Sequence, residues 1–376
     1  MLGFSAKMIE SRLGSDHQLV KVYHLLDWGR FSGLLSEVYK RKGKVAGVKP
    51  YDPVKMFRVM ILQTWHSLSD PKMEEALKVR LDFMWFTDFD VSESVPDETS
   101  ICRFRNRLVK QGLDAKLFAE LNRQLTKHNI MVEAAEAAIV DASIIESAAK
   151  PKQTVEAIPE DRKEDETKKV EVKNSADPDA AWLKKGRKST YGYKLFAVVD
   201  EHGFMRHIRT TPANQSEVTY FEPLIDGMPQ QPGMRVYSDK GNASQANRDI
   251  LKARGLKDGI MHKSARNKPL TAHQKKKNKR ISKIRYIVEQ TFGIMKNRFG
   301  FSRASYFGVD KVHAQALRKM MCLNLMKAAN MIEWVSGVPN KPQGLLGGSL
   351  MDNCALNMEI QAIMPVFNKK TGEMSG

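Results

Sequence analysis

Three acidic residues stand where their carboxylates could converge on one site. Asp141 follows the β-type run at residues 137–140, Asp239 follows a second such run at 234–237, and Glu289 lies on an expected helix. Carboxylate oxygens are the ligands that hard divalent cations prefer, and a pair of such cations can activate the attacking oxygen and stabilise the leaving oxygen of a phosphodiester. We therefore predict that Asp141, Asp239 and Glu289 bind two divalent ions and catalyse phosphodiester chemistry.

The helix around Glu289 has two faces on a 3.6-residue period. One face is expected to meet the site, and the other, mostly apolar, is expected to pack. The first contains Arg285, Glu289, Phe292 and Lys296, and the second Ile284, Val288, Thr291 and Met295. Arg285 and Lys296 could then reach phosphates flanking the metal site. Taken alone, Glu289 could equally be the ion-pair partner of Arg285, and the two aspartates could be ordinary turn residues at strand ends.

The charge of the chain indicates a polyanionic partner. Its 376 residues have a formal net charge of +18 and an isoelectric point near 9.6. Residues 252–303 hold sixteen Lys or Arg against only Asp258 and Glu289. Such concentration favours nucleic acid over a merely solvated basic face.

Further candidate DNA contacts lie in three segments. The run before the Glu289 helix is expected to contact the DNA backbone and contains Lys275, Lys276, Lys277, Lys279 and Arg280. Arg103, Arg105 and Arg107, on an expected helix, could enter a major groove, contact phosphates or simply be solvated. Tyr191 and Lys194 could stack on a base or hold a phosphate, with core tyrosines as the alternative.

The elements that must position these residues fall into two regions. Helix starts are expected at Asp52-Pro53, at Asp70-Pro71 and at Pro96-Asp97, with a fourth helix over residues 114–128. From residue 133 short β-type runs alternate with helical stretches, which predicts a mixed sheet flanked by helices.

Two segments fit neither region. Residues 146–181 contain no Phe or Tyr and alternate Lys, Glu, Asp and Pro, so we interpret them as a flexible insertion. The Gly- and Pro-rich tail, residues 336–376, has no predicted role. We therefore expect an all-α DNA-binding domain at 1–132 and an α/β catalytic domain at 133–335.

Cysteine spacing and hydropathy exclude other classes. Cys102, Cys322 and Cys354 have no metal-binding or disulfide spacing. No apolar stretch approaches the length that spans a bilayer, and the first residues do not resemble a secretory signal, so a cytoplasmic protein is expected.

Three blocks around the acids resemble bacterial insertion-sequence transposases of the Asp-Asp-Glu type, in particular the insertion-sequence-five group. They are IVDAS around Asp141, VYSDKG around Asp239, and RYIVEQTFGIMKNRFG around Glu289. The spacing of Arg285, Glu289 and Lys296 is similar to that of the superfamily, although Ser282 stands where the wider pattern has Tyr. PDETSICRFRNRL, KKGRKSTYGYKLFAVVD and TTPANQSEV are similar to further blocks of the family.

This resemblance implies a ribonuclease H-like catalytic fold and catalysis with two Mg²⁺ ions, for which Mn²⁺ could substitute. It also implies double-stranded DNA as partner, both terminal inverted repeats and target DNA, and action as a homodimer or higher oligomer. A transposase-derived protein that binds DNA without strand transfer, and a repair or restriction nuclease on the same fold, remain alternatives.

Overall fold

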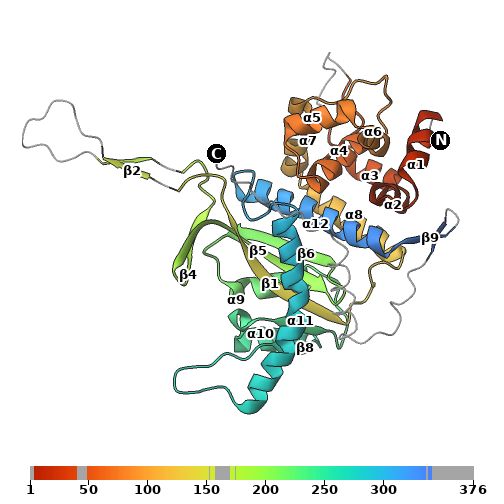
Figure 1. The fold of residues 1–376 in the computed structure, drawn as a ribbon. Helices are drawn as coiled ribbons and strands as arrows, with labels where there is room; N and C mark the ends of the chain where they lie inside the picture. Colours follow the sequence, from red (N-terminus) through yellow and green to blue (C-terminus); the bar gives the residue numbers. More distant parts are fainter. Residues whose placement is uncertain are drawn as a thin grey trace, which may run out of the picture.

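The computed structural model describes residues 4–39, 49–151, 153–156, 170–173, 175–335 and 338–340. The described residues of the first part of the chain form eight helices, drawn from red through orange to gold in Figure 1. They are α1 (Phe4–Leu13), α2 (Gln18–Leu25), α3 (Trp28–Leu35), α4 (Pro53–Trp65), α5 (Asp70–Val79), α6 (Leu81–Thr87), α7 (Glu98–Lys110) and α8 (Leu113–Lys127). The predicted all-α amino-terminal region is confirmed.

N-cap side chains account for the first residues of two of the four expected helices. The side chain of Asp52 accepts hydrogen bonds from Val54 N at 2.8 Å and Lys55 N at 2.9 Å, and Asp97 accepts one from Ser100 N at 2.6 Å. Each carboxylate thereby satisfies amide groups that a helix start leaves unpaired. Asp70 behaves differently, because it is the first residue of α5 and its carboxylate binds Gln63 and Arg105 instead.

A six-stranded mixed sheet forms the centre of the second region. Its strands are β1 (Ala137–Glu146), β4 (Ala181–Lys185), β5 (Lys188–Asp200), β6 (Met205–Pro212), β7 (Arg235–Ser238) and β8 (Lys257–Ile260). They follow the order β4-β5-β1-β7-β8, with β6 also beside β5. β5 is antiparallel to β1 and to β6, whereas β7 is parallel to β1 and β8 to β7. The antiparallel strands β6, β5 and β1, followed by β7 and β8 parallel to β1, make this the ribonuclease H-like sheet that was predicted, with β4 added at the start of β5.

Helices cover both faces of the sheet. α9 (Glu217–Asp226) and α10 (Gln245–Ala253) lie on one face, and the short 3-10 helix η1 (Lys240–Asn242) follows β7. α11 (Ala272–Asn297) crosses the other face. α12 (Val309–Met331) lies between the sheet and the amino-terminal helices, as Figure 1 shows in blue. Two small hairpins complete the described elements: β2 (Gln153–Glu156) with β3 (Val170–Lys173), and β9 (Glu333–Val335) with β10 (Val338–Asn340).

One hydrophobic cluster joins the two regions. Side chains of the amino-terminal helices, of α11 and α12, and of one face of the sheet belong to it. Asn324 of α12 fixes this junction, since its side chain bonds the backbone of Met205 at 2.9 and 3.0 Å and Asn122 at 2.8 Å. The helices are therefore held firmly against the sheet that carries the acids.

Three expectations need correction. Asp141 does not end its strand, because β1 continues to Glu146 through pairing with β5. The lysine run does not precede the Glu289 helix but forms its first turns, since α11 starts at Ala272 behind the Thr271 cap. The predicted insertion is ordered at both ends, where Asp177 is fully buried and bonds Ser147 at 2.5 Å. Residues 157–169 of it lie outside the described residues, as does most of the tail.

Candidate active site

Asp141 and Asp239 lie side by side on adjacent parallel strands. In the β1–β7 register Val140 is paired with Ser238, so the next residue on each strand is an aspartate. β7 ends there, and the Asp239 carboxylate turns back to accept a hydrogen bond from Gly241 N at 2.7 Å. The sheet alone therefore brings two of the three predicted acids together.

The surroundings of Asp141 make its negative charge costly. Its side chain is 17% exposed, and burial raises the pKa of its carboxyl, an effect to which the charge of Asp239 adds. Two contacts oppose the shift: Arg285 Nη2 lies 2.8 Å from Asp141 Oδ2, and Ala142 N donates to Oδ1 at 2.9 Å. A buried carboxyl with a raised pKa beside a second carboxylate forms a place where positive charge is favourable.

α11 brings Arg285 and Glu289 to these aspartates. Arg285 Nη1 lies 4.0 Å from Glu289 Oε1, and the Glu289 side chain is 54% exposed. Arg285 thus lies between Asp141 and Glu289, while its own Nε is buried without a hydrogen-bond partner. Within the described residues no three His, Cys, Asp or Glu side chains are close enough to hold a metal ion together.

The chemistry of this set nevertheless fits hard divalent cations. Asp141, Asp239 and Glu289 offer only carboxylate oxygens, with no sulfur or imidazole nitrogen among them. The packing of α11 agrees with the predicted pattern, since Val288, Thr291 and Met295 are buried. Phe292, expected on the face toward the site, is buried with them.

A fourth acid near the site was not predicted. Glu217, the first residue of α9, approaches the turn after β7, and a Cβ on Gly241 would lie 2.4 Å from its Oε2 and 2.8 Å from Asp239 Oδ1. An acid in the first turn of a helix is common, so nothing in the sequence distinguished it.

Lys194 is not a surface ligand for DNA, contrary to expectation. It is 6% exposed, its Nζ donates to the Gln215 carbonyl at 2.7 Å and lies 3.7 Å from Glu217 Oε1. β-strand alternation places it on the same face as the buried Phe196 and Val198. It therefore fixes the start of α9 beneath the Asp239 turn.

The three arginines of α7 have different environments. Arg103 is exposed, and Arg107 is half-buried with its guanidinium 5.2 Å from the centre of the Tyr39 ring. Arg105 is buried at 4% exposure and paired with Asp70, with one bond of 2.7 Å. The expected DNA contact of Arg105 is thus wrong for this structure, because its guanidinium ties α7 to α5.

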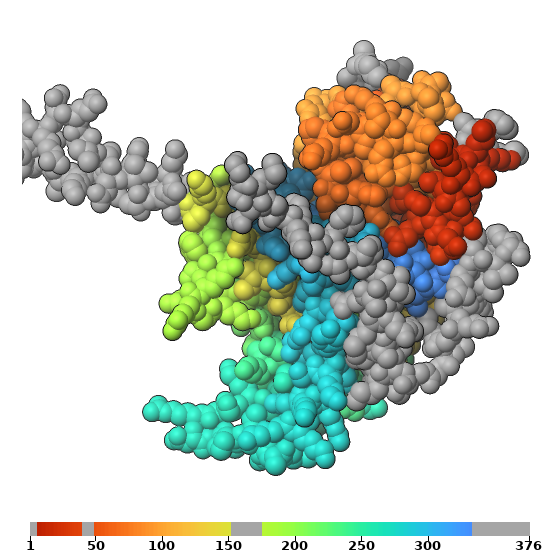
Figure 2. Space-filling view, viewed as in Figure 1, coloured from red at the N-terminus to blue at the C-terminus, as the bar shows by residue number. Residues whose placement is uncertain are grey.

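The cations of α11 lie mostly at the surface. Lys275, Lys276, Lys279 and Arg280 are exposed, whereas Lys277 is half-buried with its Nζ 3.7 Å from Asp258 Oδ2. The loop before this helix and its first turns project from the body of the molecule, as the cyan arm of Figure 2 shows.

Tyr191 is half-buried, and its hydroxyl donates to the Asp177 carbonyl at 2.7 Å.

Lys296 lies in the last turn of α11. Burial lowers the pKa of its ammonium group, with the nearby charges of Lys185 and Lys188 adding to the effect.

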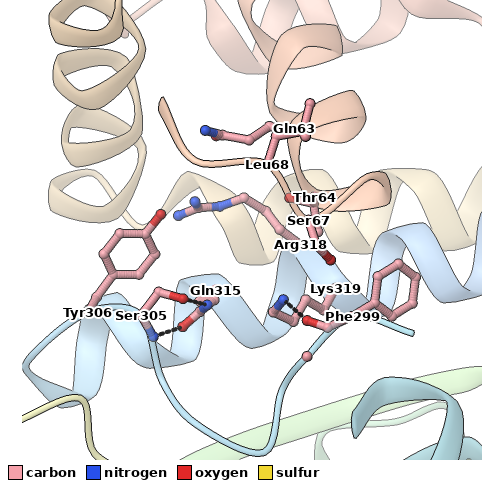
Figure 3. A pocket seen from close by; sticks show the side chains of 11 residues that line it. Gln63, Thr64, Ser67, Leu68, Phe299, Ser305, Tyr306, Gln315, Arg318 and Lys319 are labelled. Atoms are coloured by element: carbon pink, nitrogen blue, oxygen red, sulfur yellow. Dashed lines mark hydrogen bonds between the residues drawn. The ribbon is translucent and has the colours of Figure 1, made fainter. Parts of the chain in front are cut away.

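A polar cavity of about 240 Å³ lies away from the acids, between α4, α12 and the chain that follows α11. Figure 3 shows the residues that line it, among them Gln63, Tyr306 and Arg318. Arg318 Nε bonds Asp114 at 2.8 Å, and Lys319 donates to the Phe299 carbonyl at 2.5 Å. These two cations therefore join α12 to α8 and to the chain that follows α11.

Comparison with known proteins gives consistent results. Residues 134–325 match the family model Transposase DDE domain, and residues 7–107 match the model Transposase domain (DUF772). The chain is 44% identical over 229 residues to the transposase for insertion sequence element IS1106 of Neisseria meningitidis serogroup B, an alignment that covers 61% of this chain and 77% of that protein.

Solved transposase structures show only distant similarity. The piggyBac transposase synaptic complex with hairpin DNA aligns with a TM-score of 0.44 and 10% identity, covering 93% of this chain and 83% of that one. The Mos1 strand transfer complex aligns with a TM-score of 0.25 and 10% identity, covering 78% and 80%.

Proposed function

This chain belongs to the family of DDE transposases, and from that premise we propose that Asp141, Asp239 and Glu289 cut transposon ends and join them to target DNA. The chain is a DNA transposase and a divalent-metal-dependent enzyme, as its family is. The proposal concerns which residues act, which ion they use and which steps they catalyse.

The observation that carries the proposal is the placement of the acids. Asp141 and Asp239 occupy equivalent positions on adjacent parallel strands, and α11 places Arg285 and Glu289 across them. We propose two Mg²⁺ ions as the resident metals, with Mn²⁺ as a substitute. When bound, they would activate the attacking oxygen and stabilise the leaving 3′ oxygen.

The residues of the chain have separate tasks in this scheme. The three carboxylates supply oxygen ligands, and Glu289 has the freedom to turn toward the aspartates because its side chain is half exposed. Arg285 now neutralises Asp141; once cations take over that role, its guanidinium can bind a phosphate flanking the scissile bond.

Two displacements at phosphorus complete the reaction. In the first, water attacks a phosphodiester at the transposon end, and the bond from phosphorus to the 3′ oxygen breaks. In the second, the freed 3′-hydroxyl attacks a target phosphodiester, and a target 3′ oxygen leaves. One set of carboxylates can serve both steps because each is an in-line displacement at phosphorus.

The partners and organisation follow as further parts of the proposal. Residues 1–132 would recognise terminal inverted repeats, with exposed Arg103 as one contact, and residues 133–335 would cut. We propose that the protein acts as a homodimer or higher oligomer on DNA of the bacterial nucleoid. In the described residues, no helix has the length and apolarity needed to cross a bilayer.

Substitution of Glu289 by Gln tests the assignment. Gln keeps the size and helix propensity but removes the charge that binds cations. We expect Glu289→Gln to abolish nicking and joining of DNA from the borders of the coding region in Mg²⁺, with unchanged affinity for that DNA measured in Ca²⁺. Asp141→Asn and Asp239→Asn should do the same.

Glu222→Gln is the matched control. Glu222, on α9, is 50% exposed and pairs with Arg254 at 2.8 Å, so like Glu289 it is a half-exposed glutamate beside an arginine, but it does not belong to the proposed metal site. If Glu289→Gln nicks and joins at the wild-type rate, Glu289 is only the partner of Arg285. If the wild-type chain binds DNA but cuts in neither Mg²⁺ nor Mn²⁺, it is a DNA-binding protein without strand transfer.

A further inference from the structure

A basic hairpin extends from the same sheet that carries Asp141. β4 and β5 are joined at Gly186, whose φ of +62° suits a tight turn. Four of the five residues at its tip are exposed cations: Lys184, Lys185, Arg187 and Lys188. Residues 181–194 contain no acid, so this finger carries concentrated positive charge.

The hairpin also displays an aromatic ring. Trp182 is 54% exposed, whereas Trp28, Trp65 and Trp85 are each at most 7% exposed. Its ring packs against Tyr191, its cross-strand partner, with ring centres 5.5 Å apart. Since Tyr191 is anchored through its hydroxyl, the indole rests on a fixed support with one side open.

Strand register places Trp182 on the same face of the sheet as Asp141. Trp182 is paired with Tyr191, and Asp141 with Ala197, six residues farther along β5. Side chains an even number of residues apart on a strand share a face. α11 crosses this same face. The indole of Trp182, the carboxylate of Asp141 and α11 therefore lie on one side of the sheet.

Lys185 and Lys188 of the hairpin and Lys296 near the end of α11 form a group of like charges. Burial, and next the charges of Lys185 and Lys188, lower the pKa of Lys296. The one acid that pairs with them among the described residues is Glu146, 3.7 Å from Lys188 Nζ. A cluster of lysines of this kind favours the binding of a polyanion. Figure 2 shows the hairpin, in yellow-green, and the cyan arm of α11 projecting on the same side of the molecule.

We propose that the β4–β5 hairpin holds the unpaired DNA end that cleavage produces, with Trp182 stacked on a base and Lys185 and Lys188 on its phosphates. Aromatic side chains beside cations are the usual means of binding single-stranded DNA, since every base has a face that stacks. The inference rests on the proposed function, because it takes the acids of this face as the cutting site.

The experiment compares two DNA probes in Ca²⁺, where no cutting is needed. One is a fully paired duplex from an element border, and the other carries a short single-stranded extension with 2-aminopurine as its first unpaired base. Trp182→Ala should weaken binding of the extended probe by roughly fivefold or more, as expected for loss of one base–aromatic stack, and leave the paired probe unaffected. The wild-type chain should quench the 2-aminopurine fluorescence, and Trp182→Ala should not.

Control variants separate stacking from general effects. Trp182→Phe should keep the quenching, and Phe307→Ala, which removes an aromatic side chain that is 45% exposed, should keep both affinities. Lys185→Gln with Lys188→Gln should weaken both probes and reduce the salt dependence of binding. The proposal would be overturned if Trp182→Ala lost the same affinity for both probes, or if it still quenched the 2-aminopurine fluorescence. A fall in dimer content with unchanged DNA affinity would also overturn it and would assign the hairpin to contact with a second copy of the chain. Because nothing is cut in this assay, the binding result can still be interpreted if Glu289 proves not to be catalytic.

Discussion

Gly241 shows how closely the candidate site is packed at the level of one residue. Its amide holds Asp239, and its missing side chain leaves room for the carboxylate of Glu217. A Cβ there would collide with both acids, of which Glu217 lies 3.7 Å from the buried Lys194. A side chain at position 241 would therefore require one or both of these carboxylates to move.

We expect Gly241→Ala to fold but to cleave DNA roughly a hundredfold more slowly, because a displacement of about 1 Å at a reacting centre can cost that much. The measurement is single-turnover nicking in Mg²⁺ together with a thermal unfolding curve. Gly33→Ala in α3 is the control, since no atom lies within 4 Å of the added Cβ. Wild-type nicking by Gly241→Ala would show that Asp239 need not keep this position.

Residues whose role follows from the local sequence pattern could be predicted. Residues whose role follows from tertiary packing could not. Asp141 and Asp239 could be found because each follows a β-type run. Arg105 was misassigned although a signal existed: it shares a helical face with Ile101 and Leu108, both fully buried. The position of Glu217 depends on how α9 meets the Asp239 turn, which no local spacing encodes.

α11 is the element that combines catalysis with DNA affinity. Its first turns carry exposed cations, its middle carries Arg285 and Glu289, and its last turns carry Lys296. Its apolar face is buried against the sheet, so a change of charge at its exposed start should leave the fold intact. The charge of each turn can thus be tested separately.

Neutralising Lys275, Lys276, Lys279 and Arg280 to Gln should weaken binding to all DNA sequences alike. Each cation that binds a phosphate releases condensed counterions, so the slope of log affinity against log salt should fall by about one for every phosphate left without its cation. Lys277→Gln is the matched control, because Asp258 already engages that lysine. An unchanged slope in the fourfold variant would mean that these turns face solvent in the complex.

At the scale of the element, the mixed sheet and the helices with start signals could be predicted. β8, α12 and the early helices α1 to α3 were not, although α12 is the most buried helix of the junction. α12 is buried on nearly every side, and its buried residues include Arg318, Lys319 and Asn324, so it lacks the one-sided periodicity of a surface helix. Its place depends on the sheet and the amino-terminal helices, which together supply neighbours for all its faces.

The whole molecule depends on the continuous core between the helical region and the sheet. Two half-buried imidazoles, those of His66 and His207, are neutral at pH 7 in the folded chain. Burial lowers the pKa of His66 to about 4, helped by the charge of Arg80, and burial lowers the pKa of His207 to about 4, helped by His313. Both side chains would titrate near pH 6.5 in the unfolded chain.

Because folding lowers the pKa of both histidines, the free energy of unfolding must depend on pH in one direction. Between about pH 6.5 and 4 the unfolded chain binds protons at these imidazoles that the folded chain does not, so stability falls as pH falls through this window. Above it both states are neutral and this contribution vanishes. We expect the melting temperature to drop across this range, and His207→Gln, which cannot be protonated, to reduce the drop. A melting temperature whose pH dependence is the same in wild type and His207→Gln would show that His207 is accessible to protons in the folded protein.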